Sequence, residues 1–524
     1  MEQDNLTAKQ KDYAIFLPAI STFYATYIGK QRHDPNYIDK SRIPSGFNTG
    51  IEGMNWLNSK KGYFTYKWSL YSAGHANLDA SVFDAREDMI RNREAGTFLL
   101  GDSGGFQIGK GAWEGNWKDP NCPKAQKKRQ QVLKWLDTFM DRGMTLDIPS
   151  WTTRFEASRA ATGLDNFQDG VAATFINNDY FIKNRSGKCK FLNVLQGETH
   201  SDADDWYALM KKYCDPKQYP NEHFNGWAMG GQNMCDPHLV LRRLVALRFD
   251  GLLEPGLHDW MHFLGTSKLE WALLLTDIQR AVRKYHNPKF TISFDCASPF
   301  LATANGQIYY DVRLDDLTKW SYQMKASVDN KKYSKDQRNF RDALLQDKIF
   351  EKFIESPISQ RLKVNDICCY GPGDLNKIGK EGKTSWDSFS YALQMAHNVW
   401  THIYAVQEGN RIYETGVMPS MLDTAFSDKN RMFFYDDHRF FKDIVNDVFA
   451  TSDRGKAEKL IEHFNEYWKT IIGSRGNVGQ KTQNSQSMFN RLFSQTVEKT
   501  EDCYGIDDSG LDNSKLENLE MNGD

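Results

Sequence analysis

The most informative chemical groups of this chain lie together at residues 102–107, which read Asp-Ser-Gly-Gly-Phe-Gln. The apolar run at 97–101 predicts a buried strand, so the acid and the hydroxyl would stand at the end of a strand. The two glycines let the backbone turn sharply and approach a flat ligand closely, and Phe106 can offer that ligand an aromatic face. The group therefore indicates a site where a carboxylate lies beside a flat molecule.

Four later stretches repeat the arrangement, with polar residues or glycines after a short apolar or β-branched run. They are 146–147 (Leu-Asp), 194–197 (Val-Leu-Gln-Gly), 229–231 (Met-Gly-Gly) and 293–296 (Ser-Phe-Asp-Cys). Their spacing of roughly 30 to 50 residues is typical of a strand–helix–strand repeat, and barrels built that way collect functional groups at the C-terminal ends of their strands. We therefore expect five spots that are distant in sequence to converge on one pocket.

The elements that must position these groups alternate along residues 66–310, where apolar runs are followed by helical patterns such as 130–140 and 237–249. This alternation is typical of a parallel α/β fold. We predict the α/β class, with a (β/α)8 TIM-like barrel that carries a helical insertion and a divergent C-terminal extension.

Composition along the chain suggests the domain boundaries. In the N-terminal part, 15–20 is a candidate early strand, and in the charged insertion Phe350, Phe353 and Ile354 would share one helix face; 386–404 forms another amphipathic helix. The expected parts are an N-terminal extension (1–64), the barrel core (65–320), a helical insertion (321–365), the C-terminal part of the barrel with a divergent subdomain (366–473), and a polar, acidic, disordered tail (474–524).

The bulk composition excludes some classes of protein. The 524 residues are 40% hydrophobic, and 66 basic against 68 acidic residues argue against a histone-like binder. A basic groove is still compatible with this balance, because affinity for phosphates depends on local charge. Eight cysteines without regular spacing, and a charged N-terminus without a signal peptide, predict reduced thiols in the cytoplasm. No apolar stretch is long enough to span a membrane.

Taken in order, the stretches resemble the tRNA-guanine transglycosylase superfamily over roughly residues 65–310. The family's Asp-Ser-Gly-Gly-Phe/Tyr-Gln run is similar to 102–107, and its Phe-Asp-Cys segment is similar to 294–296. The remaining matches are Val-Gln-Gly (Leu-Gln-Gly at 195–197), Gly-Gly (230–231), Leu-Met-Gly (Phe-Leu-Gly at 263–265) and Asn-Gly (305–306). Each motif is weak alone, and the ordered set is specific.

The resemblance implies base exchange at a nucleotide through two displacements at the sugar carbon. Asp295 would be the nucleophile that forms a glycosyl-enzyme, and Asp102 would protonate the departing guanine and deprotonate its replacement. A carboxylate at a strand end can also cap the following helix, so the assignment of Asp295 depends on the ordered set.

The resemblance also implies a pocket for the guanine ring. Asp147 would accept hydrogen bonds from N1 and the exocyclic amine, while Gln196 and backbone N–H groups around 230–231 would donate to O6. Phe106 and Leu264 would close on the two ring faces, although both can also be core residues. The predicted base-binding residues are Ser103, Phe106, Asp147, Gln196, Gly230, Gly231 and Leu264. The family usually reads Phe-Asp-Glu-Cys where this chain has Leu-Asp-Ile-Pro at 146–149.

Two departures from the tRNA enzymes bear on the polymer and on zinc. Those enzymes carry arginines after the nucleophile, whereas 298–306 contains none; since an arginine fork makes strong phosphate and base-edge bonds, this favours a different polynucleotide. The family's Cys-x-Cys-x-x-Cys and distant histidine hold a structural zinc, whereas here 367–372 reads Ile-Cys-Cys-Tyr-Gly-Pro and is followed by His397. Adjacent cysteines are a poor pair of tetrahedral ligands, so we expect no zinc and no other cofactor.

The preferred function is a DNA-guanine transglycosylase that inserts a 7-deazaguanine derivative, as in the branch found in phages and bacterial DNA-modification systems. The alternatives are a tRNA-guanine transglycosylase of the queuosine or archaeosine type, a non-catalytic nucleic-acid-binding subunit, and a two-carboxylate sugar-hydrolysing barrel. Expected partners are DNA (alternatively tRNA) and the 7-deazaguanine base, and a homodimer is compatible. The candidate polymer contacts, which can also be solvated helix faces, are Lys124, Lys127, Lys128, Arg129, Trp135, Lys331, Lys332, Lys335 and Arg338.

Overall fold

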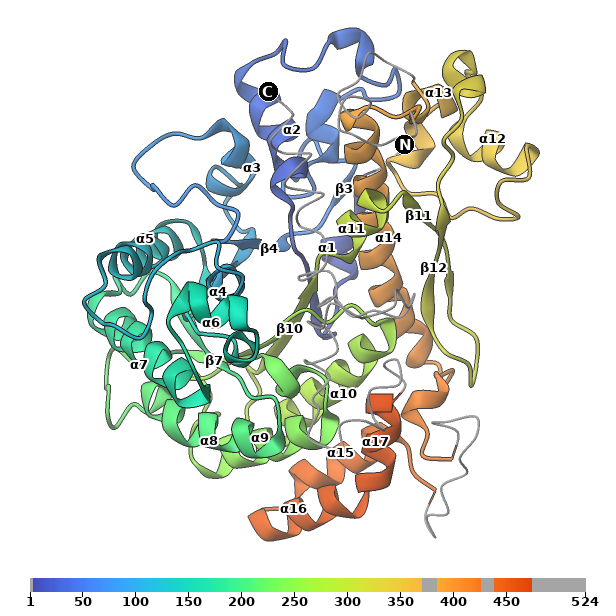
Figure 1. Cartoon of the computed structure of the whole chain (residues 1–524). Coiled ribbons are helices and arrows are strands. Elements are labelled where there is room, and N and C mark those ends of the chain that lie inside the picture. Colours follow the sequence, from blue (N-terminus) through green and yellow to red (C-terminus); the bar gives the residue numbers. More distant parts are fainter. Residues whose placement is uncertain (1–2, 370–383, 426–437, 474–524) are drawn as a thin grey trace.

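The computed structural model of the chain describes residues 3–369, 384–425 and 438–473 (Figure 1). Its centre is an eight-stranded, all-parallel sheet with the neighbour order β2-β10-β9-β8-β7-β6-β5-β4. The strands are β2 (Ile15–Pro18), β4 (Trp68–Ser72), β5 (Phe98–Asp102), β6 (Arg142–Met144), β7 (Lys190–Leu195), β8 (Gly226–Met229), β9 (Trp260–Phe263) and β10 (Thr291–Cys296).

The two edges of this sheet meet. Ala19 forms an isolated parallel bridge with Leu70, and the Ile20 N–H donates to the Leu70 carbonyl at 2.9 Å. The sheet is therefore nearly closed into a barrel, and the predicted α/β class with a TIM-like barrel is confirmed.

The first barrel strand lies in the range that the sequence assigned to an N-terminal extension. β2 is only four residues long and buried throughout, so it shows no alternation of apolar and polar residues. It pairs in parallel with β10, with Ile15 opposite Ser293. A barrel that began at residue 65 would lack this strand.

Apolar side chains from alternate positions fill the inside of the barrel, which is thus a packed core rather than a pore. This inner cluster consists of Ile15, Leu17, Leu70, Leu100, Met144, Leu192, Val194 and Ala228. The polar residues that follow the strands therefore lie above a solid apolar floor.

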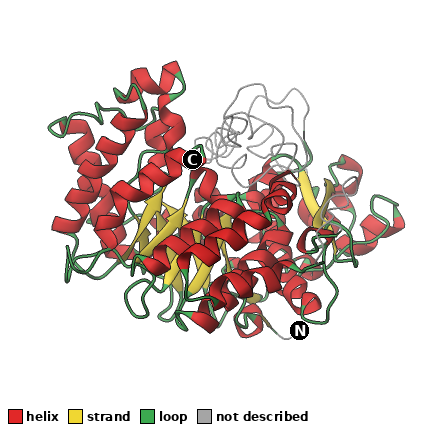
Figure 2. Cartoon of the chain, turned by 90° about the horizontal axis from the view of Figure 1, so that it is seen from below, coloured by secondary structure: helices red, strands yellow, loops and turns green. Residues whose placement is uncertain are grey.

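Helices surround the strands (Figure 2). The predicted helices at 130–140 and 237–249 correspond to α5 (Pro123–Phe139) and α9 (Pro237–Phe249). The other helices before β10 are α1 (Leu6–Lys9), α2 (Thr22–His33), α3 (Asp88–Arg91), α4 (Gly105–Gly109), α6 (Glu156–Thr162), α7 (Phe167–Asn184), α8 (His200–Met210) and α10 (Leu269–Tyr285). A short parallel pair, β1 (Asp4–Asn5) with β3 (Phe64–Thr65), lies outside the barrel.

The helix expected at 386–404 is confirmed and is longer than predicted. It is α14 (Ser388–Tyr413), in which the Asp387 side chain caps the helix by accepting from the Ser390 N–H. α14 packs on α10 and on α11 (Ser298–Ala304). Three further helices, α15 (Phe441–Ala450), α16 (Arg454–His463) and α17 (Asn465–Gly473), pack against α9 and α10 at the lower end of the molecule in Figure 1.

The segment 321–365, expected to be a helical insertion, contains a strand as well as helices. It begins with β12 (Ser321–Ala326), which forms an antiparallel hairpin with β11 (Gln307–Arg313). The helices after it are short: α12 (Phe340–Gln346) and α13 (Val364–Ile367).

The chain leaves the helical path just after α12, and the phenylalanines that follow pack on aromatic rings of other segments. Lys348 has a positive φ of 54°, which ends the helical path just after α12. Phe350 then stacks on Tyr310 with a centroid distance of 5.3 Å, and Phe353 stacks on His397 at 5.0 Å. The phenylalanines are buried by these contacts and not by a shared helix face.

Two sequence-based expectations concern the tail and the membrane. The segment 474–524, predicted to be disordered, lies outside the described residues. Among the helices of the described ranges, none combines the length and the apolar character needed to cross a bilayer.

Candidate active site

The structure places the predicted site residues at the same, C-terminal end of the barrel. Asp102 ends β5, Asp295 lies next to the last residue of β10, and Asp147, Gln196 and Gly230 follow β6, β7 and β8 directly or within a few residues. Since parallel strands end at one rim, side chains from distant parts of the sequence meet there.

The Asp295 carboxylate is held by one of its two oxygens. The Gly265 N–H donates to Oδ1 at 3.0 Å, and Nε2 of His262 lies 3.1 Å from the same oxygen. Oδ2 has no hydrogen-bond partner within the described part of the chain. The side chain is 14% exposed, so one fixed carboxylate oxygen remains accessible to a ligand.

His262 belongs to a hydrogen-bonded chain that the sequence analysis missed. Its Nδ1 lies 2.9 Å from the Ser293 Oγ, which also accepts from the Trp260 Nε1 at 2.8 Å. Because the hydroxyl accepts from the indole, its own proton is available to Nδ1. This arrangement places the imidazole proton on Nε2, where it faces Asp295.

A signal for His262 was present in the sequence. Residues two apart on a strand share a face, so Trp260 and His262 on β9 point to the same side, as do Ser293 and Asp295 on the neighbouring β10. The register sets His262 opposite Ser293. Applied to both strands, this two-residue period would have predicted that the His262 side chain lies near the Asp295 carboxylate.

Asp102 is held in a different way, as a carboxyl group suited to carrying a proton. The Ser72 Oγ donates to its Oδ2 at 2.5 Å, and the Gly74 N–H donates to that hydroxyl at 3.0 Å. Burial raises the pKa of Asp102, and the negative charge of Asp295 raises it further. The Asp102 carboxyl group therefore retains its proton more readily than an ordinary aspartate does.

Asp147 and Gln196 form a buried pair. The Gln196 Nε2 donates to the Asp147 Oδ2 at 2.7 Å. Burial raises the pKa of Asp147 to about 7, and the charge of Asp102 contributes. The Gln196 Oε1 is buried without a hydrogen-bond partner among the described residues. Such an atom is costly to leave unpaired, so the pair is poised to bind a polar ligand edge.

The glycines after β8 permit close packing on Gln196. A Cβ atom on Gly230 would lie 2.7 Å from the Gln196 Nε2, so a larger residue there would require the Gln196 amide to shift. The Gly230 N–H already donates to the Leu195 carbonyl at 2.8 Å. It is therefore not free to donate to O6 of a guanine, which corrects the role expected for Gly230. Gly231 has φ 57°, a conformation that favours glycine.

The Gly-Gly turn after Asp102 behaves as expected, whereas Ser103 does not. Gly104 has φ 80°, and a Cβ on Gly105 would lie 2.5 Å from the Asp147 carbonyl oxygen. The turn thus brings the end of β5 against Asp147. Ser103 is fully buried and donates to the Thr145 carbonyl at 3.0 Å, so it ties the two strand ends together and does not face a ligand.

The two predicted ring contacts are both half-buried. Phe106 lies on α4, with its ring centroid 5.5 Å from that of Trp151. Leu264 packs on the apolar cluster inside the barrel. Each keeps an exposed part, as a residue that closes on a ligand requires, and each also contributes to packing.

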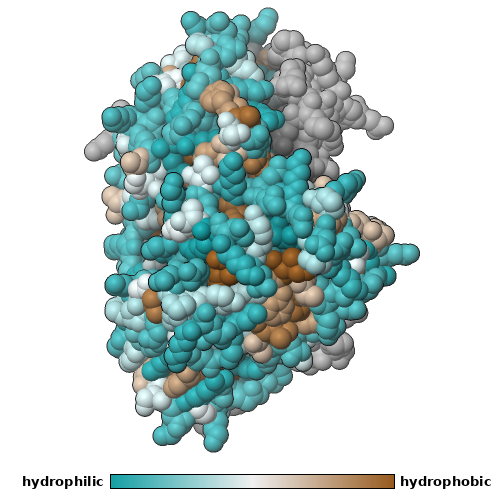
Figure 3. Space-filling view, turned by 90° about the vertical axis from the view of Figure 1, so that its left-hand side faces the viewer, coloured by the Kyte–Doolittle hydropathy of each residue, from teal (hydrophilic) through white to brown (hydrophobic). Residues whose placement is uncertain are grey.

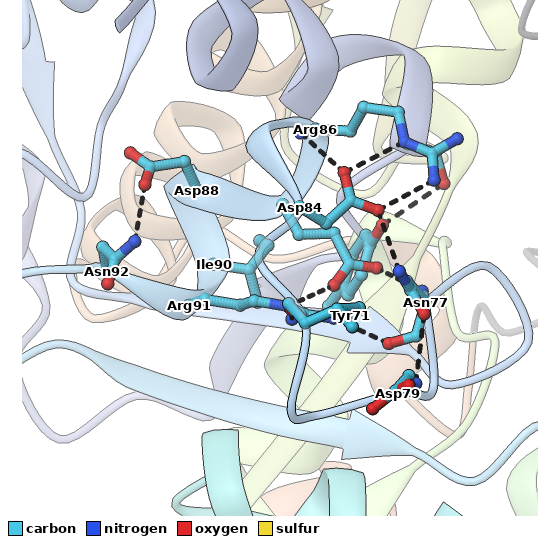
Figure 4. Close-up of polar contacts among 12 residues, drawn as sticks. Tyr71, Asn77, Asp79, Asp84, Arg86, Asp88, Ile90, Arg91 and Asn92 are labelled. Atoms are coloured by element: carbon cyan, nitrogen blue, oxygen red, sulfur yellow. Dashed lines mark hydrogen bonds and ion pairs between the residues drawn. The ribbon is translucent and has the colours of Figure 1, made fainter. Parts of the chain in front are cut away.

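A long loop that follows β4 borders this end of the barrel. Arg91 holds the loop by donating to the carbonyls of Val82 at 2.8 Å and Asn77 at 2.7 Å and to Glu87 at 2.6 Å (Figure 4). The Ala73 N–H at its start donates to the Asp102 carbonyl at 2.8 Å. The loop is thus fixed relative to the Asp102 backbone, and it exposes two-thirds of the Phe83 side chain.

The residues expected in place of the family's zinc site do not fit a metal ion. His397 uses both ring nitrogens inside the protein: Nδ1 lies 2.8 Å from the Ser356 Oγ, and Nε2 lies 2.8 Å from the Tyr309 carbonyl. The Cys368 thiol donates to the Val328 carbonyl and the Cys369 thiol to the Ser385 carbonyl. The absence of zinc stays a prediction, and no chemistry is assigned to a metal here.

The basic runs proposed as polymer contacts are only partly exposed. Arg129 is buried and donates to Asn177 at 2.6 Å, and Trp135 is fully buried, so neither can contact a nucleic acid. Lys124 pairs with Glu114, and Arg338 pairs with Asp336 and Asp347. Figure 3 shows one side of the molecule as mostly hydrophilic, with apolar residues gathered near its middle.

No family model matches this chain, and a search of curated proteins finds no match.

Proposed function

We propose that the chain is a guanine transglycosylase that exchanges guanine in DNA for a 7-deazaguanine derivative. The observation that carries this proposal is the Asp295 carboxylate, which is fixed through Oδ1 and free at Oδ2, beside an Asp102 of raised pKa. One carboxylate is suited to attack, and the other to hold a proton, which is the division of labour that a retaining exchange needs.

In the first step, Oδ2 of Asp295 attacks the sugar C1′ and the bond from C1′ to N9 of guanine breaks. The bonding pair goes to the base, and the Asp102 proton neutralises it. In the second step, N9 of the incoming base gives its proton to Asp102 and attacks C1′. The bond from C1′ to Oδ2 breaks and the carboxylate is restored, with retention at the sugar.

His262 and the Gly265 N–H stabilise the negative charge on Asp295 before attack and after release. Asp147 and Gln196 would read the donor-rich edge of guanine, because an ionised Asp147 and the Gln196 Oε1 are acceptors. Since the Gln196 Nε2 already donates to Asp147, we propose Gln196 as an acceptor and not, as the sequence predicted, as the donor to O6. The apolar floor of the barrel below them excludes water from the reacting bond.

DNA is preferred over tRNA because of the segment that follows the nucleophile. This arginine-free segment forms α11, whose Phe300 and Leu301 are buried. α11 packs on α14 and offers no charged fork to a ribonucleotide loop.

The test gives the protein both polymers in one tube with a labelled 7-deazaguanine. Label in DNA that disappears with Asp295→Asn is the expected result. Label in tRNA alone would favour the tRNA enzyme, and no label in either polymer would refute the transglycosylase assignment.

A further inference from the structure

A cavity of about 450 Å³ lies at the opposite end of the barrel from the carboxylates. Its wall includes Ile15, Trp68, Phe98, Trp260 and Thr291, the first residues of five barrel strands. The N-terminal segment that contains α1 completes it. Cavities of this size hold small molecules in many proteins, and nothing in the proposed exchange reaction uses this one.

The lining is positively charged. It contains Lys11, Lys67 and Arg283 and no aspartate or glutamate. Lys67 makes no ion pair within the described ranges, and Lys11 has only Glu414 at 3.6 Å. Arg283 donates to neutral oxygens, the Phe290 carbonyl and the Thr291 hydroxyl. Lys11 and Lys67 are exposed at the wall of the cavity, and the charge of Asp12 compensates Arg283 only in part. The lining therefore carries a net positive charge, which favours an anionic ligand.

The pKa of Arg283 is also consistent with an anionic ligand. Burial lowers its pKa, and the charge of Asp12 offsets only part of the effect. An anion in the cavity would stabilise the charged guanidinium, since a buried charge is costly unless it is paired.

The remaining wall combines aromatic side chains with small and polar residues such as Thr7, Ala8 and Thr97. The Phe98 and Trp260 rings stack on each other with centroids 4.7 Å apart and planes 18° from parallel, and the Arg142 guanidinium lies 4.7 Å from the centre of the Trp260 ring. These rings therefore offer a ligand their edges. The Lys67 Nζ lies 4.6 Å from the centre of the Trp68 ring, so a cation and an aromatic surface adjoin. This juxtaposition suits a ligand with an anionic group and a flat apolar ring.

We propose that this cavity is a second binding site, for a small molecule that joins a phosphate-like anionic group to a flat ring. The site takes no part in the proposed base exchange. One of its wall residues, Trp260, also donates to the Ser293 hydroxyl beside His262.

Binding is tested on the full chain by calorimetry with three probes: adenosine 5′-monophosphate, adenosine, and inorganic phosphate. The nucleotide should bind saturably, at one molecule per chain, and about tenfold or more tighter than either fragment. Lys67→Gln should weaken nucleotide binding about tenfold, whereas Lys60→Gln, an exposed lysine outside the cavity, should leave it unchanged. Both lysines are on the surface, so neither change threatens the fold.

Three results would overturn the proposal. They are no saturable nucleotide binding up to about 1 mM, equal affinity for adenosine and its monophosphate, and unchanged affinity in Lys67→Gln. Asp147→Ala identifies the site: nucleotide binding should survive it, and loss of binding would place the ligand among the carboxylates instead. These binding measurements do not depend on base exchange, so they test the second site even if the protein shows no exchange activity.

Discussion

Replacing Asp147 with asparagine is expected to stabilise the protein at neutral pH and to abolish recognition of the base. The side chain is almost fully buried, and burial raises its pKa from the ordinary 3.8 to about 7. The folded state therefore binds this proton more tightly than the unfolded state. The protonated Asp147 carboxyl group therefore contributes its full stabilisation of the folded state below pH 4, and this stabilisation is lost as the pH rises through 7.

The rise of the Asp147 pKa from 3.8 to about 7 means that the ionised carboxylate destabilises the folded protein by about 4 kcal/mol above pH 7. Asparagine has nearly the same volume and an oxygen that can accept from Gln196, but no charge. The variant should therefore melt at the same temperature as the wild type near pH 4, and at a higher temperature at pH 8.

The assay is thermal unfolding of both proteins from pH 4 to pH 8, together with binding of a labelled 7-deazaguanine. Asp277→Asn is the matched control: Asp277 on α10 is also buried, accepts from the Tyr413 hydroxyl at 2.8 Å, and has a pKa of about 7. It should gain stability in the same pH range and keep base binding. A difference in melting temperature that does not change with pH would refute the reasoning, and so would normal base binding by Asp147→Asn.

Four further predictions concern the proposed exchange. Asp295→Asn should abolish incorporation of label while circular dichroism stays unchanged, and near-normal incorporation would remove it as the nucleophile. Asp102→Asn should lower kcat more than it raises KM, which single-turnover kinetics measures. His262→Phe should slow exchange about tenfold or more and change its pH profile, because Asp295 loses a hydrogen-bond donor. His262→Gln should restore part of the rate. Equal rates in the wild type and both variants would exclude a positioning role for His262. Metal analysis should find no zinc, and one zinc per chain lost on changing Cys368 would contradict this.

The strand ends could be predicted from sequence because each combines an apolar run with a polar or glycine-rich turn. The sharp turn at Gly104 follows from the same local pattern, whereas the closeness of Gly105 to Asp147 is a contact between two strand ends that the local pattern does not predict. Hydrogen-bond partners could not be predicted in this way. Ser103 and Gly230 are occupied by carbonyl groups of neighbouring strands, and such pairing depends on the register of the sheet.

Residues whose position depends on distant contacts were missed. β2 is too short to show a period, and its place between β4 and β10 follows from closure of the sheet. The charged insertion predicts a helix, yet stacking of Phe350 on Tyr310 and Phe353 on His397 outweighs its helix propensity. His262 was overlooked because its importance comes from two residues on another strand.

The place of β2 in the barrel affects how the chain folds during synthesis. β2 is made first, but four residue pairs join it to β10 and only an isolated bridge joins its end to β4. At 5–20 residues per second the ribosome needs roughly 15 to 60 seconds to pass from Ile15 to Ser293. Throughout that interval an apolar strand has an unpaired edge, which is a known hazard for aggregation. We therefore expect the nascent chain to depend on chaperones until β10 has emerged, and a variant truncated before residue 291 to remain insoluble.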